Sequence, residues 1–344
     1  MIGLNNFHKD RGTHVAKSKF RNPFIIILVI AVIAIATWYF LSNTVNKKAE
    51  EYLQQYLVEN NLQDRVKWES LEASPTGSAN LKKVTFLDEK GELFLTAEEF
   101  NLTHFKQDEN VLETKAEIKG LIDVQGIAFQ EGLNLLYEKV DVPPSNAIDL
   151  DWEIKLDNTQ QTSYMRSDVL LPNLFSVETE LNADSPETIR EISKMSNSSF
   201  DSGEMSEQDL AALMALVSKV KVHGITIGVV EKGGVEKLRY EMMASEFSDD
   251  IDNLSPEQLN TEFEREIAEA RATCINESEL SAVLSDQEAA CNKVMDFLLG
   301  SSQAVKVKAS TVKPFSFDEI LMMTMMGAGP EIYAKEFGLS IDVE

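Results

Sequence analysis

An alternation of apolar and polar positions dominates the chain between residues 66 and 243. In its clearest example, Asp149–Asp157, four apolar side chains alternate with charged ones: Leu150, Trp152, Ile154 and Leu156. A period of two is typical of a strand with one face in a core and the other in water. Weaker examples lie at Leu93–Ala97, Phe175–Leu181 and Ile225–Val229. Because strands with one wet face usually pair antiparallel, the pattern predicts an antiparallel β-rich domain.

Glycines mark two expected irregularities in this β-rich region. Lys232-Gly233-Gly234 follows the last of these strands, and a glycine pair favours a hairpin turn. We therefore expect Val235–Met242 to form the next strand. Gly224 and Gly228 lie inside a strand pattern, where glycine more often marks a bulge or a close approach of two backbones than a phosphate-binding loop.

Helix signals interrupt the strands and dominate the C-terminal third. Ser185-Pro186-Glu187, Ser206–Asp209 and Ser255-Pro256 are helix starts, since they place a capping residue or proline at the first positions. The last of these precedes helical patterns over residues 256–273 and 279–299. After these helices, the pattern predicts a strand at Val305–Ser310, a helix at Phe317–Met326, a short helix after Pro330 and a final strand at Leu339–Val343. The expected fold class is α+β.

An uncharged apolar run, Pro23–Leu41, precedes all of this. Nineteen residues in a helix span about 28 Å, which matches a hydrocarbon core of about 30 Å. Trp38 and Tyr39 lie at its far end, where such rings favour the head-group layer. Five basic residues precede the run and place the N-terminus in the cytoplasm by the positive-inside rule: Lys9, Arg11, Lys17, Lys19 and Arg21.

A cleaved signal peptide is the alternative for this segment, because Ala34-Ile35-Ala36 has the spacing of a cleavage site. The apolar run nevertheless continues to Leu41 and is longer than a signal peptide requires. We therefore expect a retained single-pass anchor, with the lipid bilayer as partner of residues 23–41 and everything after it exported.

The patterns divide the chain into six regions. An apolar stripe at Val45, Ala49, Tyr52 and Tyr56 predicts a helical stalk that packs on its own domain, with a coiled-coil dimer as the alternative. The regions are a cytoplasmic basic tail (1–22), a transmembrane helix (23–41), the stalk (42–64), a β-rich exported domain (65–246), a helical segment with both cysteines (247–300) and a C-terminal strand-helix-strand region (301–344).

The net charge changes the picture of possible partners. The 344 residues carry a net charge of -25, and the first 22 contribute +4, so the rest carries -29. Such a surface repels phosphate backbones, which bind through Lys and Arg. We therefore expect no nucleic-acid partner, while a basic protein partner remains compatible with the charge.

Val66–Phe105 resembles the opening module of the AsmA-like and YdgA-like bacterial envelope proteins. The resemblance lies in an N-terminal anchor, a short stalk, and a strand that leads through a small-residue turn into a second strand, here with Leu81, Val84 and Phe86. It covers about a third of the chain. It implies a β-rich periplasmic fold, a place in the inner membrane and a role in envelope lipid homeostasis. The chain is shorter than the larger AsmA-like members, which argues against a long lipid conduit.

Two cysteines are the only candidates for a covalent site. Cys274 and Cys291 both follow the anchor, and an oxidising compartment favours a disulfide between the two helical stretches. Two free buried thiols are the alternative that a cytosolic chain would have. Neither a CxxC motif nor zinc-ligand spacing occurs.

Catalytic and cofactor motifs are absent from the sequence. Only His104 and His223 follow the anchor, and no HExxH, GxSxG or P-loop pattern occurs. We expect no enzymatic activity and no cofactor. Asp249–Asn253 has oxygen ligands for calcium but lacks the EF-hand pattern, so a solvated linker is favoured. Met322–Met326 contains four methionines that go round a helix, and we expect them to fill a core rather than bind copper or a partner.

Two functions remain compatible with these observations. The first is a non-enzymatic envelope module that binds lipid or another apolar ligand on a sheet with one apolar face. The alternative is a scaffold subunit whose acidic domain docks on a basic partner. An open apolar groove would favour the first, and a closed sandwich the second.

Overall fold

The computed structural model describes residues 63–74, 78–88, 90–108, 110–126, 129–139, 145–192, 207–235, 255–327 and 329–344, with residues 54, 57, 58, 237 and 239. The predicted tail, the predicted membrane helix, most of the stalk and the acidic stretch Asp249–Asn253 lie outside these residues. No helix in the described part of the chain is both long and apolar enough to cross a membrane.

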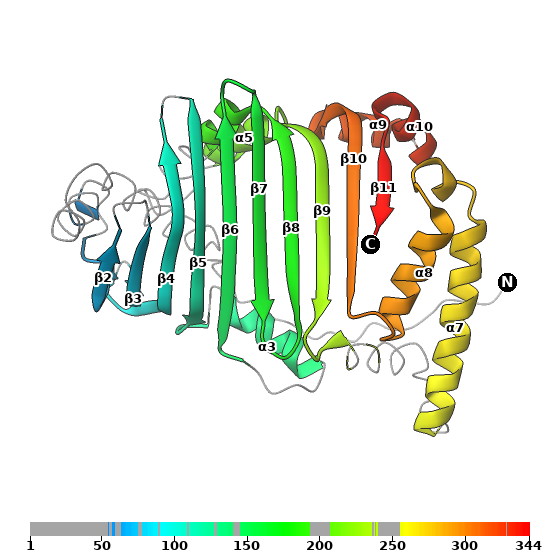
Figure 1. The fold of residues 1–344 in the computed structure, drawn as a ribbon, viewed down its shortest axis with the longest axis horizontal. Helices are drawn as coiled ribbons and strands as arrows, with labels where there is room; N and C mark the ends of the chain where they lie inside the picture. Colours follow the sequence, from blue (N-terminus) through cyan, green and yellow to red (C-terminus); the bar gives the residue numbers. More distant parts are fainter. Residues whose placement is uncertain are drawn as a thin grey trace, which may run out of the picture.

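The described chain is an α+β fold built on one antiparallel sheet of eleven strands, with several helices (Figure 1). The strands pair in the order β1-β3-β4-β5-β6-β7-β8-β9-β10-β11, and β2 also pairs with β3. The expected antiparallel β-rich fold is therefore confirmed. The strands are β1 (Val66–Lys67), β2 (Ser70–Ala73), β3 (Ala79–Leu87), β4 (Leu93–Gln107), β5 (Val111–Asp123), β6 (Ala147–Asp157), β7 (Thr162–Leu171), β8 (Phe175–Asp184), β9 (Lys221–Glu231), β10 (Ala304–Ser316) and β11 (Ser340–Val343).

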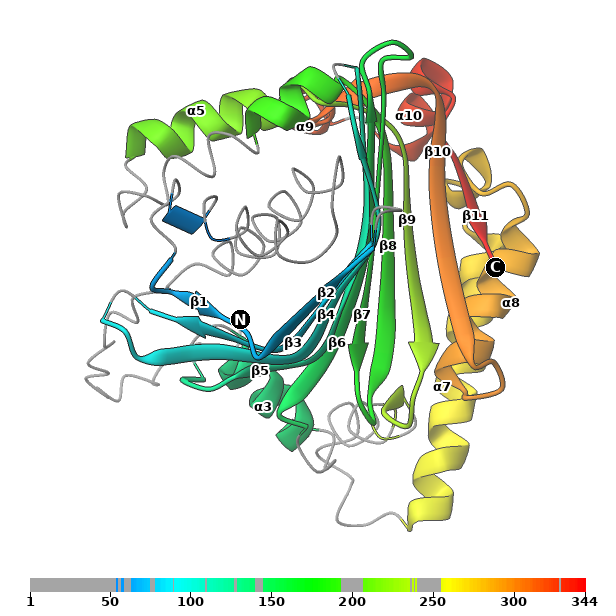
Figure 2. The same cartoon turned by 60° about the vertical axis from the view of Figure 1, so that its left-hand side comes forward.

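Helices connect the strands at their ends and border the last strands. They are α3 (Gln130–Lys139), α5 (Glu207–Val217), α7 (Pro256–Asn276), the short 3₁₀ helix η2 (Leu280–Ala282), α8 (Gln287–Leu298), α9 (Phe317–Met325) and α10 (Pro330–Phe337). Residues 186–192 are helical as well, as the proline start predicts. Figures 1 and 2 place α5, α9 and α10 at one end of the sheet, and α7 and α8 beside β10 and β11.

The strand register sorts the side chains into two faces. One row across eight strands is entirely apolar: Leu81, Phe100, Ile118, Leu150, Val169, Val177, Val229 and Val305. The next position along each strand belongs to the other face and gives a mostly polar row: Asn80, Asn101, Glu117, Asp151, Asp168, Glu178, Gly228 and Lys306. The period-two pattern of the sequence therefore produces a sheet with one apolar and one charged face.

The main core covers the apolar face over β3–β6. Leu81, Phe100 and Ile118 are at most 1% exposed and belong to one buried cluster that also contains Tyr137 of α3 and Leu57. The Tyr137 hydroxyl donates to the carbonyl of Pro172 at 2.8 Å, which satisfies its polar end inside the core. Because Leu57 is fully buried, this part of the predicted stalk packs on the domain.

A crease crosses β3, β4 and β5, where Figure 2 shows the sheet bending. Lys83 and Gly120 have φ values of 50° and 61°, which breaks the regular extended backbone. Buried positions are Leu81 before Lys83 but Val84 and Phe86 after it, so the alternation shifts by one residue while both halves face the same core. The Gly120 N–H donates to the Asp149 carboxylate at 2.8 Å instead of continuing the ladder.

The β11 edge is covered by the connection between α7 and α8. Ile341 of β11 donates to the carbonyl of Val283 at 2.7 Å and accepts from the N–H of Ser285 at 3.1 Å. Cys274 of α7 and Cys291 of α8 form a disulfide, as expected from the sequence. An unpaired edge invites association with other chains, so this connection protects the sheet.

Two local predictions were wrong. Val235, Lys237 and Arg239 are helical, whereas Val235–Met242 was expected to be a strand. The Glu231 carboxylate accepts from the N–H groups of Gly233 and Val235, which starts a helix instead of a hairpin, and β10 takes the place beside β9.

The helix expected over residues 279–299 is divided as well. It consists of η2, a single bridge at Leu284 and then α8. The Asp286 side chain accepts from the N–H of Ala289 at 3.0 Å and starts α8 anew.

Candidate functional site

Where the apolar face of the sheet reaches β9 and β10, three of its large side chains are exposed. Ile225, Ile227 and Val307 are 40%, 50% and 37% exposed, although their rows continue from buried positions of β4 and β5. Ile227 and Val307 are paired neighbours in the register, and Ile225 points to the same side two residues away. We call these three residues the open apolar face.

The open apolar face adjoins half-buried apolar side chains of the preceding strands. Ile225 pairs with Leu181 of β8, which pairs with Met165 of β7. The row of Ile227 passes through two hydroxyl side chains, Thr179 of β8 and Ser167 of β7, before it reaches Trp152 of β6, so the apolar connection runs through the neighbouring rows of Leu181 and Val177. Trp152 packs against Phe100 with ring centroids 5.9 Å apart. The exposed end therefore extends a surface that is continuous with the core. Such a surface can hold an acyl chain or another elongated apolar group, because burial of its area is favourable and needs no specific partner atom.

The polar face of the sheet, behind the open apolar face, carries an ion network. The Glu178 carboxylate lies 2.9 Å from both Arg166 of β7 and Lys306 of β10. Burial would raise the pKa of Glu178, but the hydrogen bond from Lys306 and the charge of Arg166 outweigh it, so this pKa lies below its ordinary value. These pairs hold β7, β8 and β10 together from the polar side of β9, where Gly228 lies between them.

Acidic side chains fill the middle of the polar row. Glu117, Asp151 and Asp168 are paired neighbours on β5, β6 and β7. Burial raises the pKa of the Asp151 carboxyl, Lys115 and Arg166 counteract this, and Glu117 adds to it. Among the described residues, no group of three or more His, Cys, Asp or Glu side chains is arranged to hold a metal ion. The geometry of this row therefore suits a charged surface for docking.

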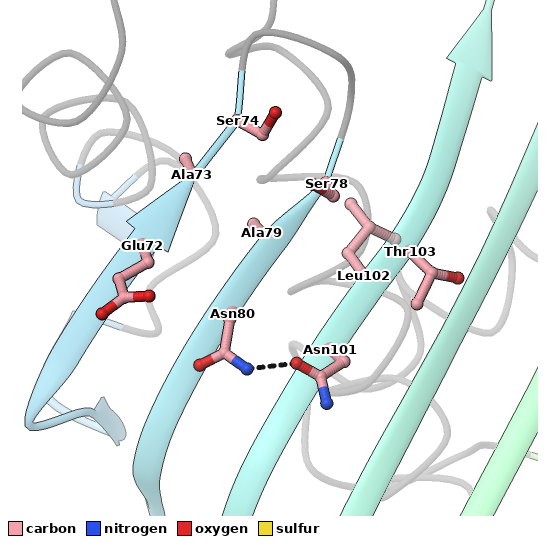
Figure 3. A pocket seen from close by; sticks show the side chains of 9 residues that line it. All are labelled: Glu72, Ala73, Ser74, Ser78, Ala79, Asn80, Asn101, Leu102 and Thr103. Atoms are coloured by element: carbon pink, nitrogen blue, oxygen red, sulfur yellow. Dashed lines mark hydrogen bonds between the residues drawn. The ribbon is translucent and has the colours of Figure 1, made fainter.

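A polar pocket of about 530 Å³ lies at the far end of the sheet, over β2, β3 and β4 (Figure 3). Asn80 and Asn101 are hydrogen-bonded across two of these strands, and Asn80 also donates to Glu99. The bond from Asn80 lowers the pKa of the Glu99 carboxyl. Two serines line the pocket without a histidine or cysteine beside them, so its lining offers polar contacts but no activated nucleophile. The full lining is Glu72, Ala73, Ser74, Ser78, Ala79, Asn80, Asn101, Leu102 and Thr103.

The two histidines after the predicted anchor lie far apart. His104 is on β4, with its Nε2 3.2 Å from Glu113, and lies at the sheet surface as expected. His223 is on β9, with its Nε2 2.6 Å from Asp184 of β8. The second pair could not be found from the sequence, because its partners are separated by 39 residues and meet only through strand pairing.

The methionines of α9 do not fill a core, so that prediction was wrong. Met322, Met325 and Met326 are 62%, 79% and 75% exposed. α9 follows β10 at the end of the sheet, and its packing side is supplied by Ile320 and Met323. The remaining half of the helix is exposed, which a periodic pattern alone does not reveal.

The strand glycines differ from each other. A Cβ at Gly224 would lie 3.0 Å from the Ala309 carbonyl oxygen, so the expected close backbone approach is confirmed there. At Gly228 the nearest atoms are side chains at 3.6 Å, which leaves ordinary room. Neither glycine lies in a phosphate-binding loop, since both are inside β9.

Comparison with models of known protein families finds no match for this chain. Comparison with curated proteins finds no significant similarity.

Proposed function

We propose that the chain is a membrane-anchored, non-enzymatic envelope protein that binds a lipid or another apolar molecule on the open apolar face. Ile225, Ile227 and Val307 carry this proposal, because they continue a buried apolar face into solvent. Leaving such side chains exposed costs about 25 cal/mol per Å² of apolar area, so a ligand that covers them is favoured.

Three further features support the proposal. The sheet has one apolar face and is not closed by a second sheet in the described part of the chain. The disulfide between Cys274 and Cys291 fits an oxidising compartment such as the periplasm. The apolar run Pro23–Leu41 supplies the anchor and the basic tail its orientation, and the AsmA-like resemblance adds the inner membrane and envelope lipid homeostasis.

The experiment compares two lysine substitutions in the full-length protein purified in detergent. Ile227→Lys places a charge in the open apolar face, whereas Val124→Lys does so at a similarly exposed valine in the turn after β5. Native mass spectrometry measures co-purifying lipid, and titration with a fluorescent fatty acid measures affinity. We expect Ile227→Lys to weaken binding about tenfold or more, because a charge in an apolar site must be desolvated. Equal binding by both variants, or none by the parent protein, would contradict the proposal.

The acidic row favours a second candidate, a scaffold that docks a basic partner. Glu117, Asp151 and Asp168 present three adjacent carboxyl groups on the polar face, and the net charge of -25 points the same way. Electrostatic docking of this kind weakens steeply with salt. A pull-down whose captured proteins are unchanged between low salt and about 0.5 M salt would argue against it.

A further inference from the structure

Most exposed apolar side chains gather at the end of the sheet where β9 begins and β10 ends. Figures 1 and 2 both place α5, α9 and α10 along this edge. In the described part of the chain, nine of the fifteen exposed large hydrophobic residues lie on these helices or the adjoining end of β10. We call these nine residues the apolar rim: Met214, Val217, Val312, Phe317, Leu321, Met322, Met325, Met326 and Ile332.

Apart from the exposed Asp318 in its first turn, the solvent-facing half of helix α9 is apolar. At 3.6 residues per turn, five exposed residues share one half of the helix: Phe317, Leu321, Met322, Met325 and Met326. The other half faces α10, where the Thr324 hydroxyl lies 2.7 Å from that of Tyr333. An ordinary surface helix has the reverse arrangement, with its polar side in water. A contiguous exposed patch of this kind marks an interaction surface.

The helices α5 and α9 leave the sheet from neighbouring strands. Lys221 at the start of β9 pairs with Ser316, which caps the N-terminus of α9. The Lys221 ammonium also lies 3.7 Å from Glu319 in the first turn of α9. α5 ends at Val217, four residues before Lys221. The apolar side chains of both helices therefore belong to one edge of the molecule.

We propose that the apolar rim inserts into the interfacial layer of the same bilayer that holds the chain's anchor. This inference rests on the proposed anchor at residues 23–41, but not on ligand binding by the open apolar face.

The length of the connection to the anchor carries the argument. Sixteen residues lead from Leu41, the end of the anchor, to Leu57, which is buried in the core. This connection reaches about 24 Å as a helix and about 55 Å when fully extended. β10 alone has thirteen residues and is about 43 Å long. The domain is therefore tethered within about one domain length of the membrane, near enough for one of its sides to rest on the lipid.

The side chains of the apolar rim suit the side of the domain that faces the lipid. Phe, Leu and Met side chains suit the boundary between head groups and acyl chains, where amphipathic helices bury their apolar faces. Three exposed basic residues border the rim, Lys219, Lys221 and Lys313, of which Lys221 lies beside Glu319. Exposed acidic residues lie on the rim helices as well: Asp318, Glu331 and Glu336. Lys219 and Lys313 can meet anionic head groups. α9 has two acidic residues, both in its first turn. The Glu319 carboxylate accepts hydrogen bonds from the N-cap Ser316, and Asp318 is exposed on the same half of the helix as the apolar side chains.

The test places a fluorescent probe on the rim of the full-length protein. Met325→Cys and Met326→Cys each add one thiol to a chain whose described cysteines are paired in a disulfide, so an environment-sensitive dye labels the new thiol. Lys90→Cys is the control, because Lys90 is exposed in the turn between β3 and β4 at the opposite end of the sheet. The labelled proteins are reconstituted in phosphatidylethanolamine and phosphatidylglycerol vesicles that contain a quencher on the lipid acyl chain.

Flotation of the vesicles first establishes that the anchor is inserted. We then expect quenching of about twofold or more at Met325 and Met326 and little at Lys90, since rim side chains insert about 5–10 Å into the interface. Flotation without quenching at the rim would overturn this inference and leave the anchor intact. Quenching that is equal at all three positions would overturn it too, as would probe self-quenching at the rim that shows contact with a second copy. Failure to float would instead overturn the anchor and this inference with it.

Discussion

At the scale of single residues, Gly120 determines how the sheet bends. Its φ of 61° lies in the left-handed region, which favours glycine, and a Cβ there would lie 2.7 Å from Cγ of Glu98. The Asp149 carboxylate accepts the N–H that the crease turns away from the ladder. Lys83 adopts a similar conformation with a side chain present, so glycine is required on β5 and not on β3.

Gly120→Ala should therefore destabilise the fold. The left-handed conformation costs a residue with a Cβ about 1–2 kcal/mol, and displacing Glu98 adds to it. The measurement is the free energy of unfolding from urea denaturation of the full-length protein in detergent. Gly126→Ala is the control, since Gly126 shares a positive φ of 74° but a Cβ at this position would meet no atom within 4 Å. A larger loss at Gly126 than at Gly120 would contradict the role given to the crease.

Two carboxyl groups of the polar row should respond to pH with opposite signs. The lowered pKa of Glu178 means that its ionised form stabilises the fold above the unfolded pKa of about 4.3, and this stability is lost as the pH falls through the folded pKa. The raised pKa of Asp151 means that its ionised form costs stability at neutral pH, a cost removed as the pH falls through its folded pKa.

We expect Glu178→Gln to lower the free energy of unfolding at pH 7 by about 2 kcal/mol, because Arg166 and Lys306 lose a charged partner. Asp151→Asn should raise the free energy of unfolding at pH 7, because it removes a carboxyl group whose ionised form costs stability. The Asp151 difference should shrink as the pH falls through its raised folded pKa toward about 4, and the Glu178 difference as the pH falls below about 4 toward its lowered folded pKa, because each parent carboxyl group becomes protonated there. Unfolding followed by circular dichroism across about pH 3–8 measures this, and differences that persist unchanged at about pH 3 would refute the assignment.

At the scale of elements, the disulfide joins the two helices that border the last strands. Cys274 is near the end of α7 and Cys291 lies in α8, where it is 1% exposed. Between them, the backbone of Val283–Ser285 covers the edge of β11. The bond therefore closes a loop whose middle part protects the sheet.

Loss of this bond should lower stability while leaving the location of the protein unchanged. For the sequence separation of 17 between the two cysteines, the chain-entropy model gives a stabilisation of about 3 kcal/mol. Cys274→Ser and Cys291→Ser should destabilise equally, and the double mutant should match either one because all remove the same bond. Thiol labelling of denatured protein, alkylated during lysis, should require prior reduction. Two reactive thiols without reduction would disprove the bond and cast the exported topology into question.

At the scale of the whole molecule, the sheet is open in two respects. Its apolar face is exposed at Ile225, Ile227 and Val307, and the apolar rim lies at one end of its strands. The polar face is closed to apolar ligands by charge. A chain anchored beside a membrane can use both apolar surfaces, one to hold a lipid and the other to rest on the bilayer.

We predict that residues 43–344 lie outside the cytoplasm. Protease added to intact spheroplasts should digest the domain, and a reporter fused after Glu344 should behave as exported. The basic tail and the uncharged run Pro23–Leu41 are the reason, through the positive-inside rule. A reporter active only in the cytoplasm would contradict the orientation.

The sequence alone determined those features that depend on neighbouring residues. The strand at Asp149–Asp157 alternates strictly, so its two faces were predictable and β6 is found there. The capping sequence Ser255-Pro256 likewise starts α7, because a cap and a proline act within one turn. The pairing of Cys274 with Cys291 followed from their number and the expected compartment.

Tertiary structure decided which strand lies beside which and what covers each face. β10 pairs with β9 although a long stretch of chain that includes α7 and α8 separates them, and this pairing leaves Val235 to start a helix. The apolar pattern of Ile227 is like that of Ile118, yet one is half exposed and the other fully buried. The methionines of α9 are exposed for the same reason. A pattern specifies which side of an element is apolar, whereas the presence of a partner on that side depends on segments far away in the sequence.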